Sequence, residues 1–228
     1  ADSKNAPYGE KPKERILQLS IKNTEFLLQR GCKLIVVACN TATTNAITYL
    51  RENYSVPFVG IEPAIKPAAL GSRSGTVGVL ATKGTLASTL FHKTSEDHAS
   101  HIHIVEREGT GLVPLIENGH IASTETRELL KKYLVPMAER GMDHLVLGCS
   151  HYPYLIPVIR EILPANIKII DSGQAVARQT KTLLEKRNLS NVQRSTGKHW
   201  FYSNTDPTVL ENLLKNANTP LKVAKLDF

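Results

Sequence analysis

The sequence has few cysteines and no long apolar run. Only three of its 228 residues are cysteine, Cys32, Cys39 and Cys149. An odd, sparse set of cysteines argues against a disulfide scaffold and favours free thiols in a reducing cytoplasm. No apolar run approaches the ~20 residues that a membrane-spanning helix needs, so we expect no membrane partner. The composition is that of a soluble globular protein with one large domain or two small ones.

Aromatic residues are also scarce, at 6%, whereas Lys and Arg exceed Asp and Glu by 28 to 21, giving a formal charge of +7. The basic residues are scattered and usually interleaved with Glu, and no basic block alternates with aromatic residues. A dedicated nucleic-acid surface needs clustered positive charge. We therefore expect no nucleic-acid partner.

The usual metal and nucleotide motifs are missing as well. His101 and His103 are expected to share one face of a strand near His98, but no Cys or further closely spaced His completes a set of metal ligands. Gly109-Thr-Gly111 lacks the third glycine of a dinucleotide fingerprint, and no P-loop or Gly-x-Ser-x-Gly motif is present. The sequence therefore predicts no metal site and no cofactor.

Short β-branched runs alternate with longer amphipathic stretches along the whole chain, which predicts an α/β fold with mostly parallel sheets. Strands are expected at 33–38, 57–61, 76–81, 101–105, 144–147, 167–170, 198–202 and 221–224. Helices are expected at 12–31, 43–53, 85–92, 123–140, 154–162, 174–186 and 207–216.

Two segments of the sequence resemble each other. Leu34-Ile-Val-Val-Ala-Cys39 and Leu145-Val-Leu-Gly-Cys149 are each a buried strand ending in a cysteine, followed by small polar residues and a helix, 110 positions apart. This predicts two pseudo-symmetric lobes, each a mostly parallel sheet flanked by helices, with the active site in the cleft between them. Prolines at 63 and 67 and the later Asp171-Ser-Gly segment place the first lobe at 1–65 plus 172–228 and the second at 66–171.

The two strand-end cysteines carry the chemistry. Each is expected at a helix start, where the helix dipole and amide donors would lower the thiol pKa. His151, two residues beyond Cys149, can exchange a proton near neutral pH. A single such cysteine would be interpreted as a packing residue. Two in matching contexts indicate an acid/base pair that flanks one carbon and inverts it, with Asn40, Thr41 and Ser150 as donors for a carboxylate.

Five motifs carry a resemblance to a known family. They are Ala6-Pro-Tyr-Gly-Glu-Lys11, Val37-Ala-Cys-Asn-Thr-Ala-Thr43, Ala81-Thr-Lys-Gly-Thr85, Leu147-Gly-Cys-Ser-His-Tyr-Pro153 and Ile170-Asp-Ser-Gly173. In order and spacing the sequence resembles the glutamate racemases of the aspartate/glutamate racemase superfamily. The resemblance implies cofactor-independent interconversion of L- and D-glutamate in the cytoplasm, with D-glutamate supplied to peptidoglycan synthesis, and a homodimer.

The resemblance also implies residue roles. Cys39 would act on the D enantiomer and Cys149 on the L enantiomer. Thr82, Thr85 and Glu117 would line the same cleft. The residues that would contact glutamate are Tyr8, Gly9, Asn40, Thr41, Ser150 and His151.

One family motif is not found. The family opens with a strand ending in Asp-Ser-Gly-x-Gly-Gly, and nothing before Asp2 supplies it. We therefore expect the first strand and helix of the first lobe to be missing, and Asp171-Ser172-Gly173 to be the C-terminal counterpart of that motif. Two alternatives stay open: a racemase of aspartate or hydantoin type, although the Cys-Asn-Thr-Ala and His-Tyr-Pro segments favour glutamate, and a non-catalytic binding module if turnover is lost.

Overall fold

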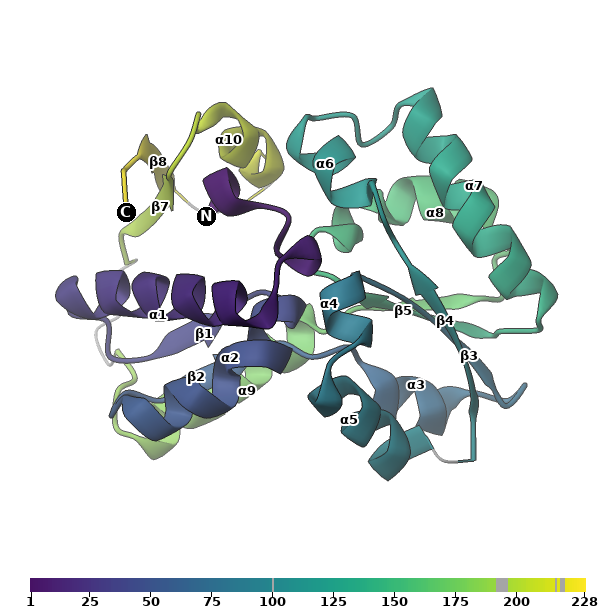
Figure 1. Cartoon of the computed structure of the whole chain (residues 1–228), viewed down its shortest axis with the longest axis horizontal. Coiled ribbons are helices and arrows are strands. Elements are labelled where there is room, and N and C mark those ends of the chain that lie inside the picture. The colour runs from purple at the N-terminus through teal and green to yellow at the C-terminus, as the bar shows by residue number, and fades with distance from the viewer. Residues whose placement is uncertain (100, 192–196, 216, 218–219) are drawn as a thin grey trace.

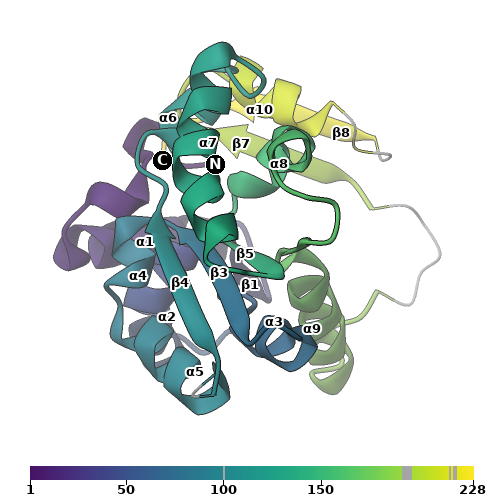
Figure 2. The ribbon, with the colours of Figure 1, turned by 90° about the vertical axis from the view of Figure 1, so that its right-hand side faces the viewer.

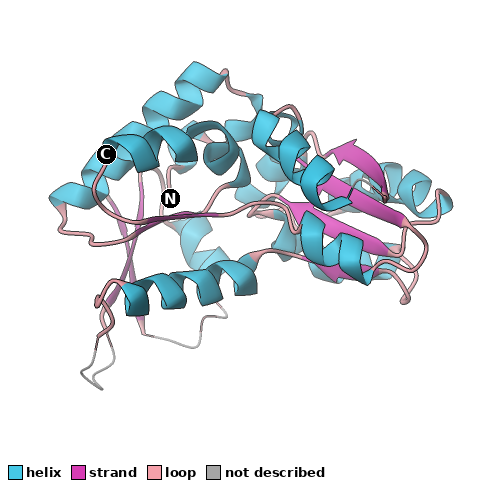
Figure 3. Ribbon diagram, turned by 90° about the horizontal axis from the view of Figure 1, so that it is seen from below, coloured by secondary structure: helices cyan, strands magenta, loops and turns pink. Residues whose placement is uncertain are grey.

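The computed structural model describes residues 1–99, 101–191, 197–215, 217 and 220–228. Its strands fall into three parallel sheets (Figures 1 and 3). Two are pairs, β1–β2 and β7–β8, and the third has four strands in the order β4-β3-β5-β6. The strands are β1 (Ile35–Val37), β2 (Phe58–Gly60), β3 (Thr76–Ala81), β4 (His103–Glu108), β5 (His144–Gly148), β6 (Lys168–Ile170), β7 (His199–Ser203) and β8 (Leu221–Lys225).

Helices connect and cover these strands. The 3₁₀ segments are η1 (Ser3–Asn5), η2 (Tyr8–Glu10) and η3 (Tyr152–Leu155). The α-helices are α1 (Lys13–Gln29), α2 (Asn40–Asn53), α3 (Ile65–Gly71), α4 (Lys83–Leu86), α5 (Thr89–Ala99), α6 (Leu112–Glu117), α7 (Thr124–Glu139), α8 (Ile156–Ile162), α9 (Gly173–Lys186) and α10 (Thr208–Leu214). None of the helices in the described ranges has the length and apolar character needed to cross a bilayer.

The four-stranded sheet is buried on both faces, as parallel sheets usually are. Leu80 and Leu147 point into a core shared with α6, α7 and α8. Val79 and Val146 point the other way, into a core shared with α3 and α5. Figure 2 shows the two helical layers on either side of this sheet. Because β3 and β5 are parallel neighbours, their carboxyl ends lie at the same edge of the sheet, where Cys149 follows β5.

The β1–β2 pair belongs to a second packed unit. Ile35 and Phe58 pack against Ala46, Ile47 and Leu50 of α2, and α1 and α9 contact α2 and β2 respectively. The molecule therefore has two lobes (Figure 1), and the two-lobed α/β prediction is confirmed. The lobe boundaries at 65 and 171 stay a prediction.

Two chain crossings join the lobes, one after β2 and one after β6. They are tied together because the buried Ser172 hydroxyl donates to the Glu62 carbonyl. A further link is the Asn45 side-chain amide, which donates to the carbonyls of Thr41 and Gly84 at 2.8 and 3.3 Å.

Several predicted elements are wrong in detail. The helix expected at 85–92 is two helices, α4 and α5, because the Ser88 hydroxyl bonds the Thr85 carbonyl and accepts from the Phe91 amide at the break. Helices α3 and α6 were not predicted at all. His101 lies in the turn before β4, so it does not share a strand face with His103. In the helix expected at 207–216, Asn216 lies outside the described residues.

Candidate active site

Cys39 lies between β1 and α2 as the N-cap of that helix. Its backbone is extended, with φ −144° and ψ 121°, and its Sγ accepts a hydrogen bond from the Ala42 amide at 3.4 Å. Helix α2 begins at Asn40, so amide donors of its first turn point toward the sulfur. Burial nevertheless raises the pKa of the Cys39 thiol, against hydrogen bonds from Ala42 and Thr41 that lower it.

Cys149 occupies the matching position after β5 in the other lobe, and it is 7% exposed. Burial raises its pKa to about 12, the amides of His151 and Tyr152 oppose that rise, and negative charge on Cys39 adds to it. A charge perturbs a pKa in this way only at short range. This interaction between thiols 110 residues apart in sequence supports a shared site at the seam between the lobes.

The expected depression of both thiol pKa values is wrong in direction. Helix-start amides do face both sulfurs, as expected. Each thiol is also withdrawn from water, and removing a thiolate from water costs more than one or two amide hydrogen bonds return. Burial therefore favours the neutral thiol form of both cysteines.

His151 and Glu117 form a polar pair beside Cys149. The His151 Nε2 lies 2.7 Å from the Glu117 Oε1, and the His151 Nδ1 lies 3.9 Å from the Cys149 Sγ. The carboxylate orients the imidazole so that its second nitrogen faces the sulfur. This pair extends the Cys-Ser-His motif to a residue at the end of α6.

Three threonine hydroxyls meet where α2 and α4 approach each other. The Thr41 Oγ1 lies 2.7 Å from the Thr82 Oγ1 and 3.2 Å from the Thr85 Oγ1, and the last two are 3.1 Å apart. Thr41 also lowers the pKa of the neighbouring Cys39, against the effect of burial. The triangle brings donors from both lobes to one place next to the first thiol, where an anion could be bound.

Asn40 is 2% exposed, and within the described part of the chain its Oδ1 has no hydrogen-bond partner. A buried acceptor without a donor is costly, so such an atom is rarely left unpaired in the working state of a protein. The Asn40 oxygen is therefore a candidate acceptor for an ammonium group of a bound molecule.

Tyr8 is held by residues that sequence reasoning missed. Its hydroxyl donates to the Asp2 carboxylate at 2.5 Å and accepts from the Asn23 amide at 3.1 Å. Burial, followed by the Asp2 hydrogen bond, raises the pKa of Tyr8, and charge on Cys39 adds to the rise, which places the ring near that thiol. No spacing or motif connects Asp2, Asn23 and Tyr8, so only the folded chain could reveal this set.

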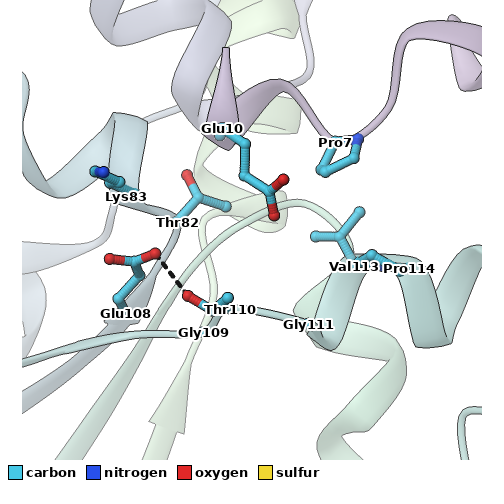
Figure 4. Close-up of a pocket in the computed structure, with 11 residues that line it drawn as sticks. Pro7, Glu10, Thr82, Lys83, Glu108, Gly109, Thr110, Gly111, Val113 and Pro114 are labelled. Carbon is cyan, nitrogen blue, oxygen red and sulfur yellow. Dashed lines mark hydrogen bonds between the residues drawn. The ribbon is translucent and has the colours of Figure 1, made fainter.

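Gly9 completes the wall next to Tyr8, because it is buried directly against Thr82. Gly9 lines a small pocket that opens there (Figure 4), with Pro7 and Glu10 on one side and the 108–111 segment on the other. Ser150 is half-buried between Cys149 and His151. The roles predicted for these side chains stay predictions, but the structure brings Cys39, Thr41, Tyr8 and Gly9 together on one side and Cys149, Ser150 and His151 on the other.

Comparison with solved structures gives the class of the protein. The chain superposes on glutamate racemase from Bacillus anthracis with a TM-score of 0.87 and 27% identity, covering all of this chain and 86% of that one. For Escherichia coli glutamate racemase, solved with L-glutamate and the activator UDP-MurNAc-Ala, the TM-score is 0.85 at 31% identity over 99% of this chain and 86% of that one. A two-lobed fold of this kind with a thiol from each lobe at the seam defines an amino-acid racemase.

The sequence gives the family. The model described as Asp/Glu/Hydantoin racemase matches residues 2–180, and the chain belongs to that family. It is 45% identical to glutamate racemase of Herpetosiphon aurantiacus, over 91% of this chain and 82% of the relative. It is 46% identical to that of Pseudomonas putida, over 94% and 81%.

Proposed function

We propose that the protein interconverts L- and D-glutamate with Cys39 and Cys149 as the two acid/base groups and without a cofactor. The observation that carries this proposal is that each lobe has a cysteine at the end of a strand, with Cys39 as the N-cap of α2 and Cys149 directly after β5 beside His151. The identities of 42–48% to relatives named glutamate racemase support glutamate over aspartate or hydantoin substrates.

Racemisation needs two proton transfers on opposite faces of one carbon. Starting from L-glutamate, Cys149 as thiolate takes the α proton, and the C–H electron pair passes to the α carbon and its carboxylate. Cys39 as thiol then gives a proton to the opposite face, which forms D-glutamate and leaves Cys39 as the thiolate. The reverse reaction runs through the same steps with the cysteines exchanged. Thiols held near the α carbon by rigid lobes supply the needed proximity.

The surrounding polar groups fit the substrate. The unpaired Asn40 Oδ1 would accept from the α-ammonium group, and the Thr41 hydroxyl with the first amides of α2 would donate to a carboxylate. Ser150 would donate from the Cys149 side, and Tyr8 with Gly9 would close the site. The Glu117-oriented His151 would stabilise Cys149 as a thiolate or return its proton.

The product indicates the pathway that the protein supplies, and the free cysteines indicate its cellular compartment. D-glutamate would supply peptidoglycan synthesis. The three cysteines are free, which supports a reducing cytoplasmic location. We also propose a homodimer, since large apolar side chains such as Leu70 and Trp200, 73% and 51% exposed, are available for a subunit contact. Light scattering during gel filtration should give a mass near twice 25.1 kDa; a monomer mass would contradict the dimer.

The activity is tested in deuterated water with L-glutamate and no pyridoxal phosphate. We expect optical rotation to decay to zero and deuterium to enter the α position at each turnover, because the proton returned comes from a solvent-equilibrated thiol. Retention of rotation together with an unlabelled α carbon would exclude the proposal.

Cysteine variants test the two-thiol assignment. Cys39→Ser and Cys149→Ser should each lower the racemisation rate by about 10²-fold or more, since each removes one acid/base partner. Cys32→Ser is the matched control, because Cys32 packs against the β1–β2 core and does not follow the end of a strand as Cys39 and Cys149 do. Full activity in either active-site variant, or equal loss in the control, would contradict the assignment.

A further inference from the structure

The loop that joins β4 to α6 is held by two tyrosine hydroxyls. The Tyr133 hydroxyl, from α7, donates to the Thr110 carbonyl at 2.7 Å. The Tyr152 hydroxyl, from η3, donates to the Gly109 carbonyl at 3.1 Å. Gly109 lies so close to Tyr152 that an added Cβ would be 2.2 Å from its hydroxyl. Two successive carbonyls of this loop are therefore fixed to side chains from different elements.

Helix α6 starts directly after this loop and carries Glu117 as its last residue. Gly111, with φ +84°, turns the chain into the helix. Leu112 and Ile116 are fully buried in the core that also contains Cys149. The position of this short helix therefore sets where the Glu117 carboxylate meets His151.

The Thr110 carbonyl does not depend on the Tyr133 hydroxyl for a hydrogen-bond donor. Thr110 is exposed, so water could satisfy its carbonyl if the tyrosine were absent. Tyr133, by contrast, is only 9% exposed, and its ring is packed in the core. What the hydrogen bond adds is a fixed distance between α7 and the start of α6.

We propose that Tyr133 is a positioning residue for the Cys149 half of the reaction: by holding the Thr110 carbonyl it places α6, so that Glu117 orients His151 beside Cys149. This inference rests on the proposed function for its kinetic consequence, but not for its structural one. Cys39 is held from other elements, through Ala42 and Thr41 of α2, so the effect is confined to one of the two thiols.

The structural consequence is tested without turnover, by nuclear magnetic resonance of the imidazole nitrogens of His151. Tyr133→Phe should shift the His151 ring resonances and weaken the signal of its hydrogen-bonded Nε2 proton. Tyr49→Phe, at a tyrosine that is 40% exposed on α2, is the matched control and should leave them unchanged. Unchanged His151 resonances in a folded Tyr133→Phe protein would overturn the proposal.

The kinetic consequence is tested with α-deuterated L- and D-glutamate. Loss of one hydrogen bond should lower kcat/KM by about 3- to 10-fold, equally in both directions because the equilibrium constant is one. The isotope effect on kcat/KM should rise for L-glutamate, since proton transfer to Cys149 becomes more rate-limiting, and fall for D-glutamate. A general loss of folded enzyme would lower the rates and leave both isotope effects unchanged, which would overturn the proposal.

A double-mutant cycle shows whether Tyr133 acts through Glu117. Glu117→Gln should give the same opposed changes in isotope effect, and adding Tyr133→Phe to it should change them little. Full additivity of the two substitutions would reject the path through α6. If the parent chain racemises no glutamate, the proposed function fails, and the His151 resonances still decide the positioning proposal.

Discussion

Gly9 and Thr82 touch across the seam between the lobes: a Cβ built on Gly9 would lie 2.5 Å from the Thr82 Cβ and 3.0 Å from its Oγ1. This contact aligns η2 with α4, and through Thr82 it reaches the hydroxyl of Thr41. The lobes therefore meet without space for one additional methyl group at this point.

Gly9→Ala should accordingly push Thr82 out of the threonine triangle. We expect overpacking to lower stability by about 1–3 kcal/mol and to raise KM for glutamate, because the hydroxyls lose their arrangement. Gly197→Ala is the matched control, as no atom of the residues that the structure describes lies within 4 Å of a Cβ at that position. Urea unfolding and steady-state kinetics measure the two effects, and equal behaviour of both variants would count against the contact.

Thr41→Val tests the triangle directly, since valine keeps the shape and removes the hydroxyl. A hydrogen bond to a charged group contributes about 1.5–3 kcal/mol, so kcat/KM should fall by roughly 10- to 100-fold. Thr182→Val, on the exposed face of α9, should keep the parent rate. A Thr41→Val enzyme with unchanged kcat/KM would show that this hydroxyl does not bind substrate.

The pH dependence follows from the raised thiol pKa values. Each direction needs one cysteine as thiolate, yet burial raises the pKa of both, that of Cys149 to about 12. Below the pKa the thiolate fraction grows tenfold per pH unit, so kcat/KM should increase from pH 6 to pH 9, by at most about tenfold per unit. Initial rates across this range test it. A flat profile would mean that one thiol is already ionised in the free enzyme.

Asp143 holds together the turn between α3 and β3. Its carboxylate accepts from the Ser72 hydroxyl, the amides of Arg73 and Ser74, and the His144 ring, at 2.6–2.9 Å. Burial alone would raise the pKa of Asp143, but these hydrogen bonds outweigh it and hold the pKa well below its ordinary 3.8. The stabilisation is therefore complete above pH 3.8 and is lost as the pH falls below it.

Asp143→Asn should lower the free energy of unfolding at pH 7 by about 1–3 kcal/mol, because charged acceptors give the stronger hydrogen bonds. The difference from the parent should shrink as the pH drops below 3.8, because the carboxylate of the unfolded parent then binds a proton that the folded carboxylate still excludes. Asp97→Asn, at an exposed position on α5, is the control. Urea titrations at pH 7 and pH 3 give both numbers, and a pH-independent difference would contradict the charge argument.

The sequence predicted elements best where burial leaves a continuous apolar run. Strand β3 has the predicted bounds because five of its six residues are buried on one face or the other. Helix α3 was missed because Pro67 was interpreted as an interruption, and the unpredicted helix α6 has Pro114 at the equivalent place. Each is the third residue of its helix, within the first turn, where no intrahelical partner exists for the N–H that proline lacks.

The candidate site, like the fold, was predicted only where the residues are close together in sequence. The strand-end motifs place Cys149, Ser150 and His151 together because they are neighbours in sequence. The Tyr133–Thr110 bond spans 23 residues and leaves no pattern. The pKa direction was missed for a related reason: local sequence indicates a helix start, but the depth of burial that outweighs it depends on the whole fold.

The four-stranded sheet is built from one uninterrupted stretch of chain, from Thr76 to Ile170, whereas the β1–β2 pair is contacted by α9, which follows that stretch. On the ribosome, the sheet that ends at Cys149 can therefore fold from sequential neighbours before α9 has been made. The unit around Cys39 has to wait for α9 to emerge. Pulse proteolysis of stalled nascent chains should accordingly find protection around Cys149 earlier than around Cys39, so that the two cysteines come together only in the last stage of synthesis.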